Sequence, residues 1–189
     1  MKKILTYRKC PVCGCGIAAK LFPVDIYVED MGLPNHYDAV RCDYCGMCYA
    51  NTTASEDDYE HYYRLFNYYS GHPGVVKKEV DLRHEAIENI LKKYSVQKQE
   101  IIDVGFGSGE LLQRLKKHGF NQISGMDPSV ESVNMLNKRG IKGFIGSVQQ
   151  EIPEEYQGKY DVAIMTEVLE HLLVPDSAIK NLRSLLKPD

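Results

Sequence analysis

The pattern of apolar and polar residues changes character along the chain and divides it into three segments. Residues 1–54 contain short alternating runs broken by glycine and proline, which predict short strands and turns. Residues 55–97 place apolar residues at helical spacing. Residues 98–189 alternate apolar runs with amphipathic stretches, which is typical of an α/β fold. We therefore expect three domains or segments with these bounds.

The middle segment predicts two helices. Ser55 and the acidic residues after it indicate a helix start. Residues 70–74, SGHPG, should break the chain between the two helices. Tyr68, Tyr69 and His72 are expected in a loop that could close over the site. The apolar positions expected on one face of the first helix are Tyr59, Tyr62, Tyr63 and Phe66, and those directed inward by the second are Val76, Val80, Ile87, Ile90 and Leu91.

The last segment predicts alternating strands and helices. Strands are expected at residues 100–104, 122–126, 143–145 and 160–165, and helices at 110–118, 130–139 and 178–186. This order predicts parallel strands joined by right-handed crossovers, hence a Rossmann-like parallel sheet.

A glycine-rich stretch, DVGFGSG at residues 103–109, follows the first of these strands and opens a helix. Its glycines permit a tight turn and close approach of the backbone to a ligand. The spacing is G-x-G-x-G, whereas dinucleotide sites carry G-x-G-x-x-G, and the sequence has no P-loop motif. Asp103 would oppose a pyrophosphate on this turn. It suits a ligand that carries an ammonium and a sulfonium, such as S-adenosylmethionine (SAM).

A second carboxylate, Asp127, is expected at the end of the next strand, 18 residues after Gly109. An acidic side chain there can accept hydrogen bonds from ribose hydroxyls. NAD sites share this geometry, so Asp127 predicts that a nucleoside binds but does not identify which one. The alternative is that Asp103 and Asp127 only cap turns around an unliganded connection.

Four motifs in order resemble the class I SAM-dependent methyltransferase family: residues 101–109, 125–129, 160–171 and 185–188. The resemblance implies that glycine-loop backbone holds the methionine part, Asp127 the ribose, and Thr166 and Glu167 the methionine side. Ser147 stands where an acidic residue is common, so the adenine contact is expected through the Val148 backbone. The cofactor residues implied are Asp103, Gly105, Phe106, Gly107, Gly109, Asp127, Pro128, Ser147, Val148, Thr166 and Glu167.

His171 is the candidate general base, because it follows the fourth strand and has a near-neutral intrinsic pKa. The alternative is that it caps or braces a helix. A base is needed only if the nucleophile carries a proton.

All six cysteines lie between Cys10 and Cys48, and four of them form two C-x-x-C-G motifs, at residues 10–14 and 42–46. Such pairs supply the four thiolates of a structural zinc site, which leaves no open coordination position. Zinc binding would then contribute roughly 10–16 kcal/mol to folding. We expect the ligands to be Cys10, Cys13, Cys42 and Cys45. Cys45 and Cys48 form a further C-x-x-C, so the identity of the ligands in the second motif stays open. We expect Cys15 and Cys48 to be small buried thiols. Disulfides are the alternative to a metal site.

The zinc module, tyrosine-rich helix and methyltransferase motifs together are similar to bacterial methyltransferases with N-terminal zinc ribbons, including sugar C-methyltransferases and type 12 methyltransferases. That family has three further strands, so we expect a sheet that is incomplete at its C-terminal end. The unpaired fourth strand would then invite self-association, and activity of this piece alone is in doubt.

Charge and composition narrow the function. With 23 basic and 26 acidic residues the net charge is −3, which disfavours a nucleic-acid partner. The sequence has neither a membrane-length apolar run nor a signal peptide, so a cytoplasmic protein is expected. The favoured function is methylation of a small molecule, such as a sugar or natural-product intermediate. The alternatives are an RNA methyltransferase and a non-catalytic module that binds SAM or a partner.

Overall fold

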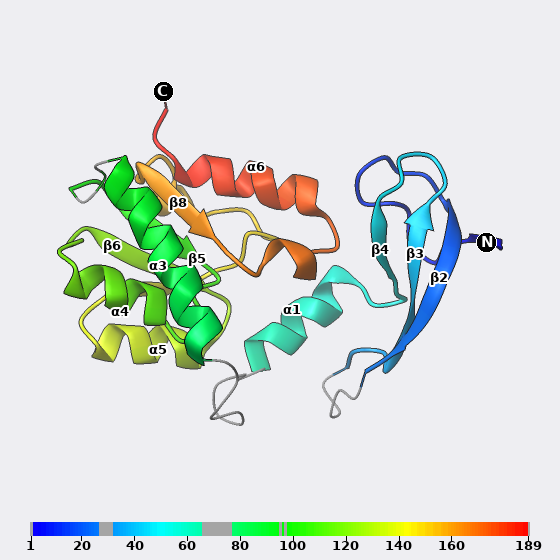
Figure 1. Ribbon diagram of the computed structural model, residues 1–189, viewed down its shortest axis with the longest axis horizontal. Coiled ribbons are helices and arrows are strands. Elements are labelled where there is room, and N and C mark those ends of the chain that lie inside the picture. Colours follow the sequence, from blue (N-terminus) through cyan, green and yellow to red (C-terminus); the bar gives the residue numbers. More distant parts are fainter. Residues whose placement is uncertain (1, 27–31, 66–76, 95, 97, 189) are drawn as a thin grey trace. The chain divides into compact units, whose positions relative to one another are not determined.

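The computed structural model describes residues 2–26, 32–65, 77–94, 96 and 98–188 (Figure 1). The chain forms two compact units. Unit 1 comprises Met1–Leu65 and Leu172–Ser177, and unit 2 comprises Phe66–His171 and Ala178–Asp189. The segment boundaries expected after residues 54 and 97 stay predictions.

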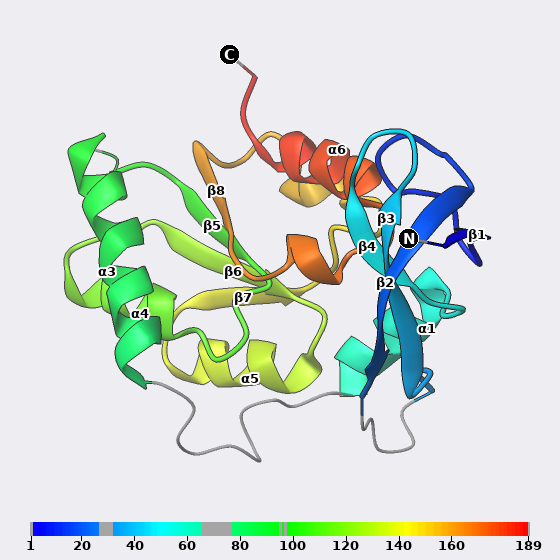
Figure 2. The same cartoon turned by 45° about the vertical axis from the view of Figure 1, so that its right-hand side comes forward.

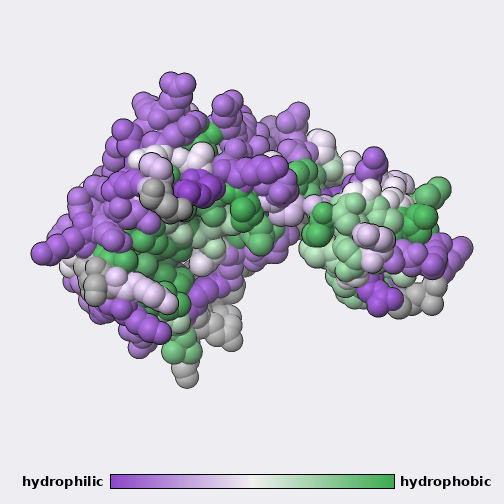
Figure 3. All heavy atoms as spheres, turned by 90° about the horizontal axis from the view of Figure 1, so that it is seen from above, coloured by the Kyte–Doolittle hydropathy of each residue, from purple (hydrophilic) through white to green (hydrophobic). Residues whose placement is uncertain are grey.

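Unit 1 contains an antiparallel sheet in the order β1-β2-β3-β4. Each cysteine motif forms the turn between two adjacent strands, so the metal-binding pattern coincides with the hairpin ends. The buried core is small and includes Cys10, Val40 and Tyr49, while hydrophobic residues also lie on the surface of this unit (Figure 3). So small a core needs a further source of stability. The strands are β1 (Lys3–Leu5), β2 (Ile17–Asp25), β3 (His36–Cys42) and β4 (Cys48–Asn51).

Helix α1 (Glu56–Leu65) belongs to unit 1 and begins where the sequence predicted. The Ser55 hydroxyl accepts a hydrogen bond from the Asp58 backbone amide at 3.2 Å. The Asp58 carboxylate in turn accepts one from the Ser55 amide at 2.8 Å. This reciprocal arrangement satisfies two free amides of the first turn. The rings of Tyr59 and Tyr63 stack with centroids 6.4 Å apart, which confirms their shared face, whereas Phe66 lies outside the described residues.

Unit 2 contains a fully parallel sheet in the order β7-β6-β5-β8. Helices α4 and α5 connect neighbouring parallel strands and cover one face, and α6 covers the other (Figures 1 and 2). The central strand β5 is buried along its whole length. The Rossmann-like fold expected from the sequence is confirmed. The strands are β5 (Ile101–Val104), β6 (Ile123–Asp127), β7 (Lys142–Ile145) and β8 (Val162–Met165).

The helices of unit 2 agree with the sequence expectations at most ends. Helix α6 begins at Pro175, three residues earlier than expected, because proline fits the first turn of a helix. The helical elements are α3 (Lys77–Lys93), α4 (Glu110–Lys117), α5 (Val130–Lys138), α6 (Pro175–Leu185), and the short 3-10 turns η1 (Glu154–Tyr156) and η2 (Leu169–His171). In the described residues, none of the helices has the length and apolar character needed to cross a membrane.

One inward-facing residue of α3 was predicted wrongly. Leu91 is buried and Ile87 packs against the same core, but Ile90 is 57% exposed. Glu88 is 2% exposed, so the buried face of α3 includes Glu88 and Leu91 and leaves Ile90 on the solvent side. The carboxylate is buried because it is paired, as described below. Val76 lies outside the described residues.

Strand β8 is an edge strand of the described sheet and pairs with β5. Tyr160, which lies just before β8, forms an isolated parallel bridge with Leu186. The Tyr160 carbonyl also accepts a hydrogen bond from the Lys187 amide at 2.8 Å. The residues after α6 thus run beside the approach to β8. Self-association through this edge stays a prediction.

Candidate functional site

The glycine loop joins β5 to α4 in a conformation that requires glycine. Gly105, Gly107 and Gly109 have φ angles of +72°, +54° and +70°, in the left-handed region that L side chains rarely adopt. A Cβ added to Gly105 would lie 2.4 Å from Cγ2 of Val168, so the turn after β8 packs directly on this backbone. Phe106 is buried within the loop and packs into a core with Leu112.

Two buried carboxylates lie at the carboxyl ends of β5 and β6. Asp103 is 3% exposed and Asp127 is 6% exposed. Burial, together with the neighbouring Asp127 charge, raises the pKa of Asp103 to about 8. Burial also raises the pKa of Asp127, against the opposing effect of backbone hydrogen bonds. In the part of the chain that the structure describes, no Lys or Arg pairs with either carboxylate. In their ionised form these carboxylates would therefore stabilise a ligand that carries positive charge and would repel a pyrophosphate.

Asp127 also organises the loops around it. Its Oδ2 accepts a hydrogen bond from the Gly107 amide at 2.8 Å, and its Oδ1 accepts one from the Ser129 amide at 2.9 Å. The carboxylate thus joins the glycine loop to the start of α5, with Pro128 between. Asp127 therefore does cap the turn before α5, which was the alternative to ligand binding. Each carboxylate oxygen keeps further acceptor capacity for a ligand hydroxyl, so capping and ribose binding are compatible.

The remaining cofactor candidates follow β7 and β8. Ser147 and Val148 come after β7, and Val148 is 2% exposed. Asn181 of α6 donates to the carbonyl oxygens of Val148 and Gln150, each at 2.8 Å, and so fixes this loop. Thr166 and Glu167 come directly after β8. All candidates thus lie at or beyond the carboxyl ends of four parallel strands, where α/β folds bind ligands. Their individual roles stay predictions.

His171 is the last residue of η2 and is exposed. Its backbone amide donates to the Val168 carbonyl at 3.0 Å, which closes the turn that packs on Gly105. The backbone of His171 therefore lies beyond the carboxyl end of β8, in the same turn as Val168. The role of His171 as a base stays a prediction. Tyr68, Tyr69 and His72 lie outside the described residues.

Glu88 is a buried carboxylate with three partly exposed partners, a cluster that could not be seen in the sequence. It pairs with Lys92, with Nε of Arg114 at 2.6 Å and with Nδ1 of His118 at 2.7 Å. Burial alone would raise the pKa of Glu88, but the hydrogen bonds from these three partners lower it to about 2. The cluster joins α3 to α4. Only the i, i+4 spacing to Lys92 signals it in the sequence.

Four cysteine sulfurs gather in unit 1. The Sγ atoms of Cys10, Cys13, Cys42 and Cys45 all lie within 4.8 Å of one another. The Cys10–Cys45 distance is 3.6 Å and the Cys13–Cys42 distance is 3.5 Å. Four ligands at a Zn–S distance of about 2.3 Å in a tetrahedron are about 3.8 Å apart, so the arrangement fits zinc.

The two cysteine motifs share one backbone pattern. The Gly14 amide donates to the Cys10 carbonyl, and the Gly46 amide donates to the Cys42 carbonyl. Both glycines have left-handed φ angles, +74° and +79°, as a sharp turn around a metal requires. This repetition supports Cys42 and Cys45 as the second pair.

The two remaining cysteines point elsewhere. The thiol of Cys15 approaches the Ile17 carbonyl, and that of Cys48 approaches the Gly46 carbonyl. The expectation that both are buried was wrong, because Cys48 is exposed and Cys15 is half-buried. Cys48 is the first residue of edge strand β4, which leaves its side chain in solvent.

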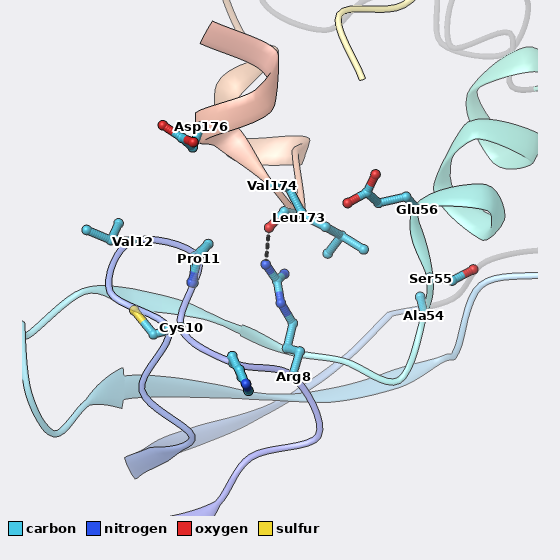
Figure 4. Close-up of a pocket in the computed structure, with 12 residues that line it drawn as sticks. Arg8, Cys10, Pro11, Val12, Ala54, Ser55, Glu56, Leu173, Val174 and Asp176 are labelled. Carbon is cyan, nitrogen blue, oxygen red and sulfur yellow. Dashed lines mark hydrogen bonds between the residues drawn. The ribbon is translucent and has the colours of Figure 1, made fainter. Parts of the chain in front are cut away.

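A cavity of about 570 Å³ adjoins the first cysteine motif within unit 1 (Figure 4). Arg8 crosses it and donates to the backbone carbonyl of Leu173. Burial lowers the pKa of Arg8. Glu56 and Asp176 also line the cavity, so its charges are mixed and define no single ligand class.

Comparison with known families decides the classification. A family described as "Methyltransferase domain" matches residues 78–189, more than half of the chain. The chain belongs to this methyltransferase family. The match covers the glycine loop, both buried carboxylates and the turn after β8, and the cysteine motifs lie before it.

Curated relatives of this methyltransferase include ubiquinone biosynthesis O-methyltransferases. That of Colwellia psychrerythraea is 33% identical over 107 residues, which cover 54% of this chain and 43% of the relative. That of Rickettsia felis is 34% identical over 125 residues, which cover 63% of this chain and 50% of the relative. The chain thus spans about half the length of the curated relatives it matches.

Solved structures show the same fold. Magnesium protoporphyrin IX methyltransferase from Synechocystis, solved with bound SAM, has a TM-score of 0.52 at 22% identity, covering 71% of this methyltransferase and 74% of that chain. A protein from Pyrococcus horikoshii has a TM-score of 0.51 at 24% identity, covering 67% and 61%. These similarities show the Rossmann-like fold of unit 2.

Proposed function

We propose that this chain is the cofactor-binding part of a SAM-dependent methyltransferase that acts on a small molecule. The observation that carries the proposal is the pair of buried carboxylates, Asp103 and Asp127, for which the described residues supply no Lys or Arg partner. Such a site disfavours phosphate and favours a cationic nucleoside. The family match to residues 78–189 agrees with this chemistry.

The residues of the site would bind and orient the cofactor, which brings the transferable methyl group on its sulfonium. The glycine-loop backbone would hold the methionine part, and Asp103 would offset its positive charge. Asp127 would accept hydrogen bonds from the ribose hydroxyls through its remaining lone pairs. The Val148 backbone, held by Asn181, would face the adenine.

For the substrate, we propose an oxygen nucleophile on a small molecule, because the relatives are named as O-methyltransferases. A sugar or natural-product intermediate is the finer form of this proposal. His171 would accept the hydroxyl proton if the substrate needs a base.

We also propose a structural zinc ion in unit 1, held by Cys10, Cys13, Cys42 and Cys45. Four thiolates close the coordination sphere, so the metal would stabilise the fold and take no part in methyl transfer. The sulfur separations of 3.5 and 3.6 Å support this proposal.

The test is calorimetric titration of SAM into the chain between pH 6 and pH 9. Asp103 is neutral below about pH 8 and negative above it. Affinity should therefore rise with pH through this range. In Asp103→Asn the rise should disappear, and binding above pH 8 should weaken about tenfold, the equivalent of ~1.4 kcal/mol of lost charge interaction.

The matched control is Asp161→Asn, which removes an exposed carboxylate paired with Lys187 at the amino end of β8. It should leave the affinity and its pH dependence unchanged. Tighter binding of a dinucleotide than of SAM, or a pH profile that Asp103→Asn does not alter, would refute the proposal.

A further inference from the structure

Glu167 has an unusual backbone conformation. Its φ angle is +54°, and it is the one residue other than glycine with positive φ in the described part of the chain. An L residue adopts this region at an energetic cost and stays there only where surrounding contacts hold it. Glu167 lies two residues beyond β8, next to the glycine loop, so the contacts that hold it bear on the site.

Two contacts fix the turn that contains Glu167. On one side, the Arg83 guanidinium of α3 forms an ion pair with the Glu167 carboxylate, across 84 residues of sequence. On the other side, the next residue, Val168, packs on the backbone of Gly105, where it fills the space that a Cβ would occupy. The turn is therefore held between a helix before the sheet and the loop that faces the ligand.

We propose that Arg83 is a positioning residue for the cofactor pocket. Its ion pair keeps Glu167 in the left-handed region and thereby keeps Val168 on Gly105. Arg83 acts through Glu167 and has no direct role in binding. This proposal rests on the proposed function, because the pocket that it maintains is the SAM pocket.

The pair is partly exposed, with side-chain exposures of 36% for Arg83 and 60% for Glu167. Its loss should therefore produce a moderate effect. In Arg83→Met, the turn should relax and SAM should bind about threefold to fivefold more weakly, as suits a partly exposed pair. Arg83→Lys should restore most of the affinity, because a charged partner remains.

A double-mutant cycle with Glu167→Gly separates positioning from general stability. Glycine adopts positive φ without strain, so Arg83→Met should have no further effect on SAM affinity in that background. The control is Lys187→Met, which breaks another partly exposed pair, with Asp161, at the opposite end of β8. It should leave SAM affinity unchanged, and urea midpoints of all variants should report any loss of stability.

A second readout needs no cofactor. Hydrogen exchange of the peptide covering residues 166–171 should be faster in Arg83→Met than in the wild-type chain, and unchanged in Lys187→Met. If the wild-type chain does not bind SAM, the proposed function fails, and this exchange measurement still tests the positioning role. The positioning role is refuted if Arg83→Met leaves exchange in this peptide unaltered. It is also refuted if the loss of SAM affinity persists in full in the Glu167→Gly background.

Discussion

Replacing Gly105 with alanine tests how tightly the glycine loop is built. The added Cβ would meet two separate penalties. The φ angle of +72° is unfavourable for any L residue, at about 1–2 kcal/mol. The Cβ would also lie 2.4 Å from Cγ2 of Val168, an overlap that typically costs about 1–3 kcal/mol.

Together these penalties predict a loss of about 2–5 kcal/mol in the free energy of unfolding of unit 2. This is a large share of the 5–15 kcal/mol typical of a whole domain. The measurement is urea denaturation followed by circular dichroism, with every variant compared with the wild-type chain in the same zinc-containing buffer.

Gly119→Ala is the matched control. Gly119 has a φ angle of +89°, but an added Cβ would meet no atom within 4 Å. It should show the strain penalty alone, about 1–2 kcal/mol. In the double variant Gly105→Ala/Val168→Ala, the overlap is relieved, so the two substitutions should couple favourably. If Gly105→Ala costs no more than Gly119→Ala, or if Val168→Ala fails to couple with it, the close packing described here is wrong.

Three further predictions follow from the same geometry. Glu88→Gln should remove an acid-sensitive part of the free energy of unfolding. The contribution of Glu88 is complete above about pH 4.5 and is lost as the pH falls through about 2. Plots of unfolding free energy against pH that stay parallel for the wild-type chain and the variant from pH 7 to pH 3 would contradict this. Mass spectrometry of the intact chain should detect one zinc ion in the wild-type chain and in Cys48→Ser, and none in Cys45→Ser. The reverse result would reassign the ligands. Asn181→Asp keeps the side-chain shape but loses the donor to two carbonyls, so it should destabilise unit 2 by about 1–3 kcal/mol; an unchanged urea midpoint would show that these hydrogen bonds contribute nothing.

The features that could be predicted from the sequence are those fixed by local chemistry. The run IIDV predicts a buried strand, and the glycines after it predict a turn with left-handed φ angles, since no other residue adopts them without strain. The repeated C-x-x-C-G motif identified the four sulfurs that gather, because both copies build the same turn.

The features that could not be predicted depend on distant partners. Ile90 was expected inward from its spacing, but the buried face of α3 is set by Glu88 and its partners, Arg114 of α4 and His118 directly after α4. The role of Val168 was not visible, because its contact with Gly105 joins residues 63 positions apart. The ion pair between Arg83 and Glu167 gave no signal either, since each residue alone is an ordinary surface charge.

The path of the chain through the two units limits how this protein can be dissected. Leu172–Ser177 belongs with unit 1 although it stands between β8 and the body of α6, both of which belong to unit 2. Unit 1 is therefore interleaved in sequence with unit 2, so a cut after residue 65 does not separate the two units cleanly. Deleting residues 1–65 would uncover Leu173, which is 8% exposed, and would strip its carbonyl of the Arg8 donor. A chain shortened to residues 78–189 would thus keep Leu172–Ser177 without the rest of unit 1.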